Sequence, residues 1–468
     1  MKKIYLILLT ASGLPSCSVG PDFQLPNFTS GTRWKESAST AATRLPDNWW
    51  RLFNDRDLTR LVERALVANN DLAAAKSRVD TSRALVGVDR AKLFPSLDLS
   101  SKLGINRNSA DILSENIPPG ADVNLQSERY RSSFDLAYDP DLWGRNKRAI
   151  EASSAEAAAA DARLDSLRLG VATEVARQYF LLRGLDAQQM VLQSTLKSRQ
   201  AALDIQKSKT EAGITDGLAT TRARTEFELA QNDLAIVQRQ RGSAENALAV
   251  LCGTVPSTFS LTFRTGNDAL PEILPGLPAD VLNRRPDVRA AEQELRAASA
   301  RIGVAEAAFY PDFVLSAGGG FESIDIANFL NWENRVLSLG AGIVAPIIDG
   351  GMKKSSAQAA RSRYEEALAK YRQALLVALR EVEDALVDLK GLARSRSALE
   401  RARASSQDTC RLSQERYDKG LTSYFEVVDA ERELLRVQLV LSQIDAQQRI
   451  TLAALAKALG GGWSGKPI

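Results

Sequence analysis

The sequence predicts an α+β membrane protein in which a duplicated unit gives four transmembrane β-strands per protomer, continued by long coiled-coil helices. Three observations predict this class: an internal repeat, short segments that alternate between apolar and polar residues, and long segments with a seven-residue apolar period. The chain has 468 residues, 44% of them hydrophobic, which suffices for two or three ordinary domains or for one elongated structure.

The N-terminus has the pattern of a lipoprotein signal peptide. Lys2 and Lys3 precede a short apolar segment, and Leu14-Pro15-Ser16-Cys17 resembles the lipobox at which bacterial lipoproteins are cleaved and acylated. We therefore expect residues 1–16 to be removed, Cys17 to carry the lipid, and residues 17–55 to form a lipid-anchored segment. The alternative is an ordinary secretory signal that happens to contain a cysteine. The rest of the chain has no apolar run of about eighteen residues, so no transmembrane helix is expected.

The chain is internally duplicated. Four blocks of the first half recur in the same order in the second half, and Pro95, Gly144 and Gly213 find counterparts in Pro311, Gly350 and Gly420. The paired blocks are 91–104 with 307–320, 138–157 with 344–363, 210–231 with 417–438, and 247–253 with 455–461. We therefore divide the chain into repeat 1 (56–255), a linker (256–278), repeat 2 (279–462) and a tail (463–468).

Both repeats have the same predicted order of elements. A first helix, a pair of strands, one very long helix, a glycine-containing turn and a second helix follow one another. The predicted first helices are 56–92 and 279–309, the strand pairs lie within 96–140 and 312–346, the long helices are 146–211 and 352–418, and the last helices are 218–251 and 422–459.

The long helices carry a heptad pattern. Leu375, Leu379, Val382, Leu386 and Leu389 are spaced alternately by four and three residues, and Val437, Leu441, Ile444, Gln448, Thr451 and Leu455 continue this spacing on the last helix. Such a stripe packs against neighbouring helices as a left-handed coiled coil. At about 1.5 Å per residue a helix of this length reaches roughly 100 Å, more than a globular core needs.

The strand segments alternate with a period of two. In repeat 1, Leu97, Leu99, Leu103 and Ile105 fall on one face of the strand, whereas Asp98 falls on the other. Segments of about ten residues with this pattern are typical of transmembrane strands that have a lipid face and a wet face. Four strands cannot close a barrel, and exposed edges would leave backbone groups unpaired in lipid. Eight strands enclose an interior that side chains fill, so a homotrimer with a 12-stranded barrel is expected.

The composition argues against several functions. The sequence contains no histidine, and none of its cysteines forms a CxxC pair, so we expect no catalytic residues, no metal site and no cofactor. The net charge of +3 gives no reason to expect nucleic acid as a partner. The helix layout separates Cys252 from Cys410 along the helices, so both thiols are expected to be free.

Several motifs together resemble the outer membrane factor family (TolC- and OprM-like), and within it the NodT-type efflux lipoproteins. The motifs are CSVGPDF (17–23), WWRLFND (49–55), YPDF (310–313), IIDGGMKKSS (347–356), RYDKGLTSYFEVVDAER (416–432) and ALGGGW (458–463). The resemblance covers essentially the whole mature chain. It implies a trimeric barrel in the outer membrane, continued by an α-helical barrel in the periplasm of a Gram-negative bacterium.

The resemblance also implies partners and site residues. The family provides the exit duct of tripartite efflux pumps, which bind a periplasmic adaptor (membrane fusion protein) and an inner-membrane transporter, expected here to be of the RND type. The periplasmic gate then falls on Tyr417, Phe425, Asp429 and Arg432; Phe425 replaces the aliphatic residue that is usual in relatives. The adaptor-contacting tip falls on Gly213, Ile214, Thr215, Gly217, Leu218, Gly420, Leu421, Thr422 and Ser423.

Two alternatives remain at this point. One is a type I protein-secretion channel with the same fold, against which the predicted lipidation and the SVGPDF start argue. The other is a coiled-coil structural lipoprotein without a pore, against which the period-two strands in both repeats argue. A pair of i,i+3 residues such as Asp429 and Arg432 could equally be an ordinary helix-surface pair.

Overall fold

The computed structural model describes residues 18–28, 31–36, 45–107, 109, 126–266 and 270–461. Cys17, the expected signal peptide and the expected tail lie outside these residues. The α-helices are α1 (Arg56–Ala68), α2 (Asn70–Ala91), α4 (Arg145–Glu211), α5 (Gly217–Leu251), α6 (Pro278–Arg284), α7 (Pro286–Ala307), α8 (Met352–Asp418) and α9 (Tyr424–Ala458). The strands are β1 (Ser96–Arg107), β2 (Gln126–Tyr138), β3 (Asp312–Ser323) and β4 (Arg335–Val344). Short 3₁₀ turns include η2 (Trp49–Phe53) and η3 (Pro256–Thr258).

The chain forms two compact units. The first comprises the described residues of Met1–Pro26, Val79–Ala159 and Glu292–Lys370, and it contains the whole sheet. The second comprises the described residues of Asn27–Arg78, Ala160–Ala291 and Tyr371–Ile468, and it contains α5 and α9 with the greater part of α4 and α8. Each repeat therefore contributes to both units.

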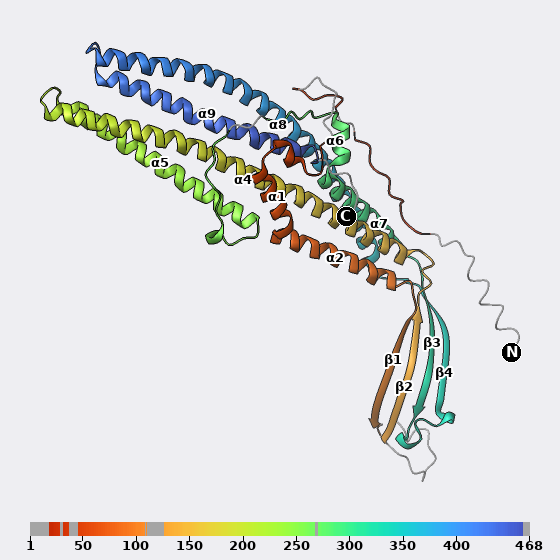
Figure 1. The fold of residues 1–468 in the computed structure, drawn as a ribbon. Helices are drawn as coiled ribbons and strands as arrows, with labels where there is room; N and C mark the ends of the chain where they lie inside the picture. The colour runs from red at the N-terminus through yellow and green to blue at the C-terminus, as the bar shows by residue number, and fades with distance from the viewer. Residues whose placement is uncertain are drawn as a thin grey trace, which may run out of the picture. The chain divides into compact units, whose positions relative to one another are not determined.

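The sheet of the first unit is antiparallel throughout, with the strand order β1-β2-β3-β4 (Figure 1). Repeat 1 supplies the pair β1–β2 and repeat 2 supplies the pair β3–β4. The two pairs meet in the middle of the sheet, where Phe134 lies opposite Gly319. The outermost strands β1 and β4 are consequently the edges of the sheet within this chain.

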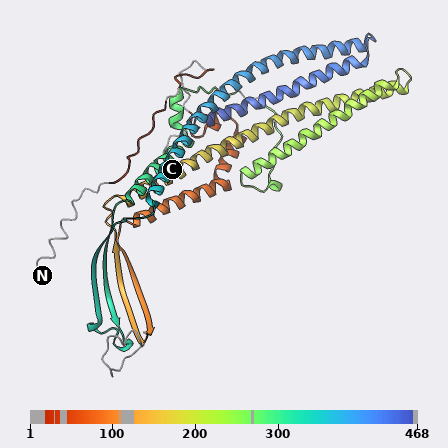
Figure 2. The ribbon, with the colours of Figure 1, turned by 180° about the vertical axis from the view of Figure 1, so that it is seen from behind.

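Two helical hairpins dominate the second unit. Helices α4 and α8 are each 67 residues long, and α5 and α9, which follow them, are each 35 residues long. Figures 1 and 2 show each long helix running beside the shorter helix that follows it, with both turns at the same end of the unit. The two repeats thus form the same hairpin twice.

Only some of the residues in the predicted heptad pattern are buried in the structure. On α9, Val437, Leu441 and Leu455 are buried as expected, whereas Ile444 is half-buried. On α8, Leu375 and Val382 are buried, and so are Ala378 and Ala385, each three residues further along the helix. Leu379, Leu386 and Leu389 are displaced to the half-exposed border of the stripe. The physical reason is that small residues let neighbouring helices approach closely, while leucine fills the wider space beside the contact.

The helix expected over 56–92 is broken at Asn69. The backbone of Asn69 is extended, and its side-chain oxygen accepts hydrogen bonds from the amides of Asp71 (3.0 Å) and Leu72 (3.1 Å), so it caps a new helix. Its side-chain amide also donates to the carbonyl of Leu251 at 3.0 Å. The expectation of one continuous helix was therefore wrong, because the polar side chain of Asn69 satisfies the groups that a continuous helix would pair itself.

The helix expected over 279–309 is likewise two helices, α6 and α7. Arg285 is extended at the break, as expected for a residue that precedes proline, and Pro286 is the first residue of α7. The buried guanidinium of Arg285 donates to the carbonyl of Ala458 (3.0 Å) and to the carboxylates of Asp287 (2.6 Å) and Glu381 (2.7 Å). This arginine ties the break to α8 and α9.

Candidate functional site

One face of the sheet is apolar across all four strands. The register brings Leu97 opposite Leu136, Leu136 opposite Ala317, and Ala317 opposite Leu339, so these residues share a face. The large apolar members of this face are Leu97, Leu99, Leu103, Ile105, Phe134, Leu136, Phe313, Leu315, Phe321, Leu337, Leu339 and Ile343. Many of them are open to the surroundings: Leu97 is 63% exposed and Leu339 is 81% exposed. An apolar surface of this extent is unusual on a protein surrounded by water.

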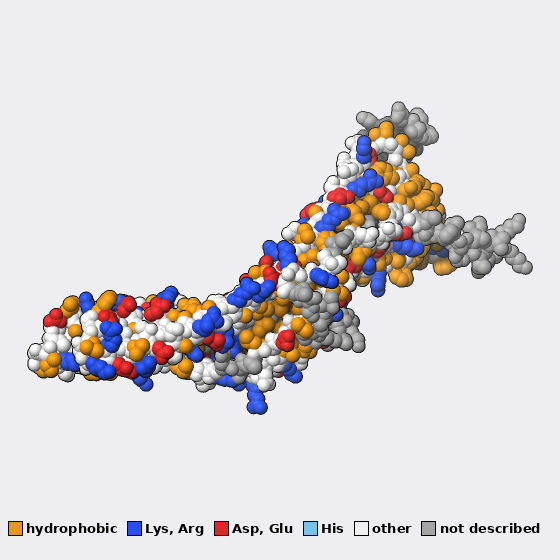
Figure 3. Space-filling view, turned by 90° about the horizontal axis from the view of Figure 1, so that it is seen from above, with side chains coloured by type: hydrophobic (Ala, Val, Ile, Leu, Met, Phe, Trp, Pro, Cys, Tyr) orange, Lys and Arg blue, Asp and Glu red, His pale blue; other side chains and the backbone are white. Residues whose placement is uncertain are grey.

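The opposite face consists mainly of polar or small residues, and its larger apolar members are Val314, Val336 and Val344. Arg129 and Arg131 of β2 lie 3.6 and 3.7 Å from the carboxylate of Glu322 on β3. The register adds Asp98, Lys102, Asp135, Ser316, Gly318, Ser338 and Gly340 to this face. In Figure 3, hydrophobic side chains gather along one side of the strands, while charged side chains lie over the other. The sheet thus has one face suited to lipid and one suited to water.

The described residues give two further negative results. None of the helices in the described part of the chain is both long and apolar enough to cross a membrane. Over the same residues, no group of three or more Asp, Glu or Cys side chains is arranged to hold a metal ion.

Both hairpin turns of the second unit are built in the same way. Gly213 and Gly420 each have φ of +70°, and the following residues, Ile214 and Leu421, donate backbone hydrogen bonds of 2.9 Å to Lys209 and Arg416. This left-handed glycine closure ends a helix without a side-chain clash. Ile214 is 72% exposed and Leu421 is 67% exposed, so each turn presents one aliphatic side chain.

The other residues expected at the tip lie in or beside these two turns. Thr215 belongs to the first turn, and Gly217 and Leu218 begin α5, whose N-cap is Asp216. Thr422 and Ser423 belong to the second turn, because α9 begins at Tyr424 rather than at residue 422. The structure brings both groups of expected residues to the ends of the two hairpins.

Tyr417, in the last turn of α8, contacts the other hairpin. Its hydroxyl accepts hydrogen bonds from the side-chain amide of Gln206 (2.9 Å) and from the ammonium of Lys209 (3.3 Å), both on α4. The same ammonium lies 4.8 Å from the centre of the Tyr417 ring, and Gln206 is 1% exposed. Tyr417 also lies against Tyr424, with 5.5 Å between ring centres; burial raises the pKa of Tyr424 to about 12.

A buried carboxylate forms the second link between the hairpins. Glu226 of α5 accepts short ion-paired hydrogen bonds from Arg199 of α4 and from Arg432 of α9. The Arg199 guanidinium also donates to the backbone carbonyl of Glu226 at 2.8 Å. The side chains of Arg199 and Glu226 are each 6% exposed, whereas Arg432 is 49% exposed. The hydrogen bond to Glu226 raises the pKa of Arg432, and burial raises the pKa of Glu431 beside it.

The two other expected gate residues lie on the exposed side of α9. Phe425 is 49% exposed, and the guanidinium of Arg222 on α5 lies 5.3 Å from the centre of its ring. Asp429 is exposed, and the ion pair of Arg432 is directed to Glu226 of the first hairpin. The structure therefore connects Tyr417, Phe425 and Arg432 to the first hairpin and leaves Asp429 on the surface of α9.

Sequence reasoning missed Arg199, Gln206 and Glu226. All three residues come from repeat 1. Gln206 and Glu226 have partners in repeat 2 that are 211 and 206 positions away, whereas Arg199 pairs with Glu226 within repeat 1. A single helix face gives no sign of the partner helix. The available signal was chemical: a glutamate at an interior position of a long helix has to find a cationic partner.

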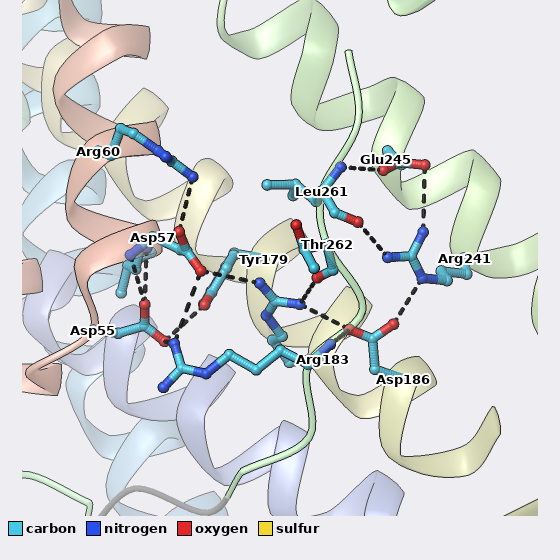
Figure 4. A network of polar contacts seen from close by, with 12 residues as sticks. Asp55, Asp57, Arg60, Tyr179, Arg183, Asp186, Arg241, Glu245, Leu261 and Thr262 are labelled. Carbon is cyan, nitrogen blue, oxygen red and sulfur yellow. Dashed lines mark hydrogen bonds and ion pairs between the residues drawn. The ribbon is translucent and has the colours of Figure 1, made fainter. Parts of the chain in front are cut away.

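A third polar network lies further along the second unit (Figure 4). The carboxylate of Asp186, which is fully buried, accepts hydrogen bonds from Arg183 (2.8 Å) and Arg241 (2.7 Å). These arginines also donate to the carbonyls of Thr262 and Leu261, both at 2.8 Å. The network therefore holds the segment after η3 against α4 and α5.

The same network reaches the start of α1. Asp55 caps that helix through the amides of Asp57 (2.9 Å) and Leu58 (3.1 Å), and its other oxygen accepts a hydrogen bond of 2.7 Å from the hydroxyl of Tyr179. Burial is the main cause that raises the pKa of Tyr179, so its hydroxyl stays protonated and serves as a donor. Each charged group drawn in Figure 4 is paired within the protein, so the network joins α1, α4, α5 and the segment after η3.

Comparisons with known proteins identify a family and several structures of the same fold. Residues 61–254 and 277–461 match the family described as outer membrane efflux protein. The solvent efflux pump outer membrane protein SrpC of Pseudomonas putida is 32% identical over 460 residues, which are 96% of each chain. The outer-membrane channel OprN superposes with a TM-score of 0.86 at 30% identity, covering 96% of this chain and all of that one. The CmeC outer membrane channel of Campylobacter jejuni superposes with a TM-score of 0.90 at 23% identity, covering 96% of each chain, and supports the fold.

Proposed function

The chain belongs to the outer membrane efflux protein family, and from this premise we propose that it is the outer-membrane exit duct of a tripartite efflux system. The duct conducts small molecules passively from a periplasmic adaptor and an inner-membrane transporter of the RND type to the exterior. The observation that carries the proposal is the sheet, which carries large apolar side chains from all four strands on one face and mainly polar or small residues on the other. Passive conduction requires no catalytic residue.

The open edges of the sheet support a trimer. In lipid, the backbone groups of β1 and β4 need partners, and another copy of the chain offers the complementary edge. Two copies would supply eight strands, whose interior side chains fill, whereas three copies supply twelve strands and leave room for a channel. The apolar face then contacts lipid and the polar face lines the channel.

The two alternatives are less well supported. A structural coiled-coil lipoprotein has no use for an apolar face that is exposed on all four strands. A protein-secretion channel could share the fold, but SrpC is named as part of a solvent efflux pump. By analogy we propose that the cargo consists of small apolar or amphiphilic molecules, including solvents and antibiotics.

The gate is proposed to be the contact between the two hairpins near their turns. Glu226 joins α4, α5 and α9 through Arg199 and Arg432, and Tyr417 joins α8 to α4 through Gln206. Around a threefold axis these contacts would hold the second hairpin against the first and keep the channel narrow. Phe425 and Asp429 lie on the exposed side of α9, where an apolar ring and a ring of like charges can form a releasable constriction.

The adaptor is proposed to bind the two hairpin turns. Each turn offers a rigid glycine closure and one exposed aliphatic side chain, Ile214 or Leu421. Because the two turns are equivalent in structure, a trimer presents six similar contact points to the adaptor.

Recording ion currents across planar bilayers tests the proposed function. The purified lipidated protein should give rare, discrete openings, and a variant with a weakened gate should give frequent ones. If neither the parent nor the Glu226→Ala variant conducts after verified insertion, the proposed channel is refuted.

A further inference from the structure

The segment Ser18–Phe23, here called the N-terminal strap, is bound at the junction between β2 and α4 in the first unit. The amide of Val19 donates a hydrogen bond of 3.1 Å to the carbonyl of Trp143. The guanidinium of Arg148, in the first turn of α4, donates to the carbonyls of Val19 (3.1 Å) and Gly20 (3.2 Å). The side chain of Arg148 is only 7% exposed because the strap and Glu151 cover it.

Three glycines let the strap lie close to the protein. Gly20 has φ of +97°, and a Cβ atom there would lie 2.4 Å from the Cα of Gly303 on α7. A Cβ on Gly303 would lie 2.8 Å from the carbonyl oxygen of Val19. Gly144, with φ of +72°, approaches the Cα of Ser18 in the same way. The contact is therefore shaped on both sides for a polypeptide backbone at this position.

The internal repeat provides a comparison within the same chain. The block alignment places Gly350 and Lys354 of repeat 2 where repeat 1 has Gly144 and Arg148, and it places Gly87 where repeat 2 has Gly303. Gly350 and Gly87 have no atom within 4 Å of a Cβ position. Lysine lacks the planar fork of arginine, which can reach two carbonyl oxygens at once. The binding features for the strap are therefore special to one of the two equivalent junctions.

Aromatic side chains mark this junction as a membrane interface. Phe94 precedes β1 and is 71% exposed, and Tyr310 precedes β3 and is 40% exposed. Trp143 stacks on Tyr310 with 4.7 Å between ring centres, and its indole donates to the carbonyl of Pro311 at 2.8 Å. Transmembrane β-sheets carry such aromatic residues at the boundary between lipid and water.

We propose that Arg148 and the β2–α4 junction form a docking site for the chain's own processed N-terminus. The site recognises the backbone carbonyls of Val19 and Gly20, and it holds Ser18 beside Gly144. The strap therefore meets the protein at the junction that carries Trp143 and Tyr310, one residue after the expected acylation site. This inference rests on the proposed outer-membrane duct and its lipidation. It adds that contacts with the protein hold the segment next to the lipid anchor in place. Without these contacts, a flexible segment would connect the anchor to the folded protein.

Spin labelling of the strap tests the proposal. A nitroxide is attached to Pro21→Cys in a Cys410→Ser background, where the remaining Cys252 is buried, and the protein is placed in lipid vesicles. The electron paramagnetic resonance spectrum should show an immobile label in the parent. It should show a mobile label in Arg148→Gln, which loses the ion pair to Asp22 of the strap at 2.9 Å as well as the two carbonyl contacts. In Arg148→Lys, which can keep the ion pair to Asp22 but not both carbonyl contacts, the label should be intermediate in mobility.

Two further variants separate docking from lipidation. Arg145→Gln changes an exposed arginine on the same helix turn, whose ion pair is with Asp312 of β3 and not with the strap's Asp22, so its label should stay immobile. Cys17→Ala, made in a chain that carries an ordinary cleavable secretory signal in place of residues 1–16, gives a processed N-terminus without the acyl group, and its label should also stay immobile. If Arg148→Gln fails to fold, Gly303→Ala serves in its place, because the added methyl group meets Val19 from the α7 side.

Three results would overturn the proposal. The first is a mobile label in the parent. The second is a label in Arg148→Gln or Gly303→Ala that is as immobile as in the parent. The third is a label that becomes mobile when Cys17 is replaced by alanine while Arg148 is kept. Channel conductance is recorded from the same vesicle preparations. If the channel conducts but the label on the strap is mobile, only the docking site is refuted. If the protein inserts but does not conduct, the proposed duct is refuted.

Discussion

Removing the carboxylate of Glu226 should loosen the contact between the two hairpins. Glu226→Ala leaves the guanidinium of Arg199 buried, with a side-chain exposure of 6%, without its charged partner. It also releases Arg432, whose ion pair joins α9 to α5. Of these two contacts, only that of Arg432 joins the two hairpins, so its loss favours an arrangement in which the hairpins separate and water solvates Arg432.

The magnitude follows from burial. The pair of Arg199 and Glu226 lies within the first hairpin, so its loss lowers the stability of that hairpin in both arrangements. The pair that joins the hairpins is Arg432 with Glu226, and Arg432 is half-exposed, so its loss should cost about 1.5–3 kcal/mol, as for a hydrogen bond to a charged group. Since about 1.4 kcal/mol corresponds to a tenfold change in an equilibrium, the balance between closed and separated hairpins should shift by roughly ten- to a hundredfold per protomer. The exposed Asp429 is solvated in both arrangements, so Asp429→Ala alone should shift the balance far less.

Two measurements check this prediction. In planar bilayers, the open time of Glu226→Ala should greatly exceed that of the parent, and cells that express the variant should take up more vancomycin. Glu228→Ala is the matched control, because Glu228 is an exposed glutamate two residues further along α5. A double-mutant cycle with Arg432→Ala should give a coupling energy well above 1 kcal/mol.

The reasoning is refuted if Glu226→Ala and Glu228→Ala conduct alike while both form stable assemblies. It is also refuted if the effects of Glu226→Ala and Arg432→Ala are simply additive. A larger effect of Asp429→Ala than of Glu226→Ala would place the main restraint on the exposed side of α9 rather than between the hairpins.

Three more predictions concern other parts of the chain. Cys17→Ala should abolish incorporation of radioactive fatty acid, and equal labelling of variant and parent would disprove lipidation at this residue. Leu339→Arg, on the apolar face of β4, should cost about 2–4 kcal/mol and lower the yield of inserted protein, whereas Ser338→Arg on the polar face should insert normally. Burial raises the pKa of Asp165 to about 6 from 3.8, so the folded state binds its proton more tightly than the unfolded state, and stability falls as pH rises from about 4 to 6. Asp165→Asn should remove this slope in urea unfolding and stabilise the protein at pH 7 by on the order of 2–3 kcal/mol.

The fold was largely predictable because its signals are long and repeated. The duplication fixes the order of elements, and the 67-residue helices and four strands extend over enough residues for their periods to be read. The comparison with OprN confirms the fold class and the family resemblance. Breaks within the shorter helices were missed for local reasons. Pro286 gave a signal at Arg285, but Asn69 acts through a cap that looks like any other polar residue on a helix surface.

The candidate site was less predictable, because its contacts join residues far apart in the sequence. Motif resemblance pointed to Tyr417 and Arg432, but it did not identify Gln206 or Glu226 as their partners. The pairing depends on how the α4–α5 hairpin faces the α8–α9 hairpin, and the heptad pattern does not encode that rotation. On α8 the buried positions include Ala378 and Ala385, so the leucine pattern alone does not identify which residues of the helix are buried.

The central claim is that copies of this chain close one barrel from edge strands β1 and β4. Native mass spectrometry of the protein released from the outer membrane in mild detergent tests this most directly. The account predicts an assembly of three chains, because twelve strands are the smallest closed set here with room for a channel. A stable, membrane-extracted monomer or dimer would contradict it.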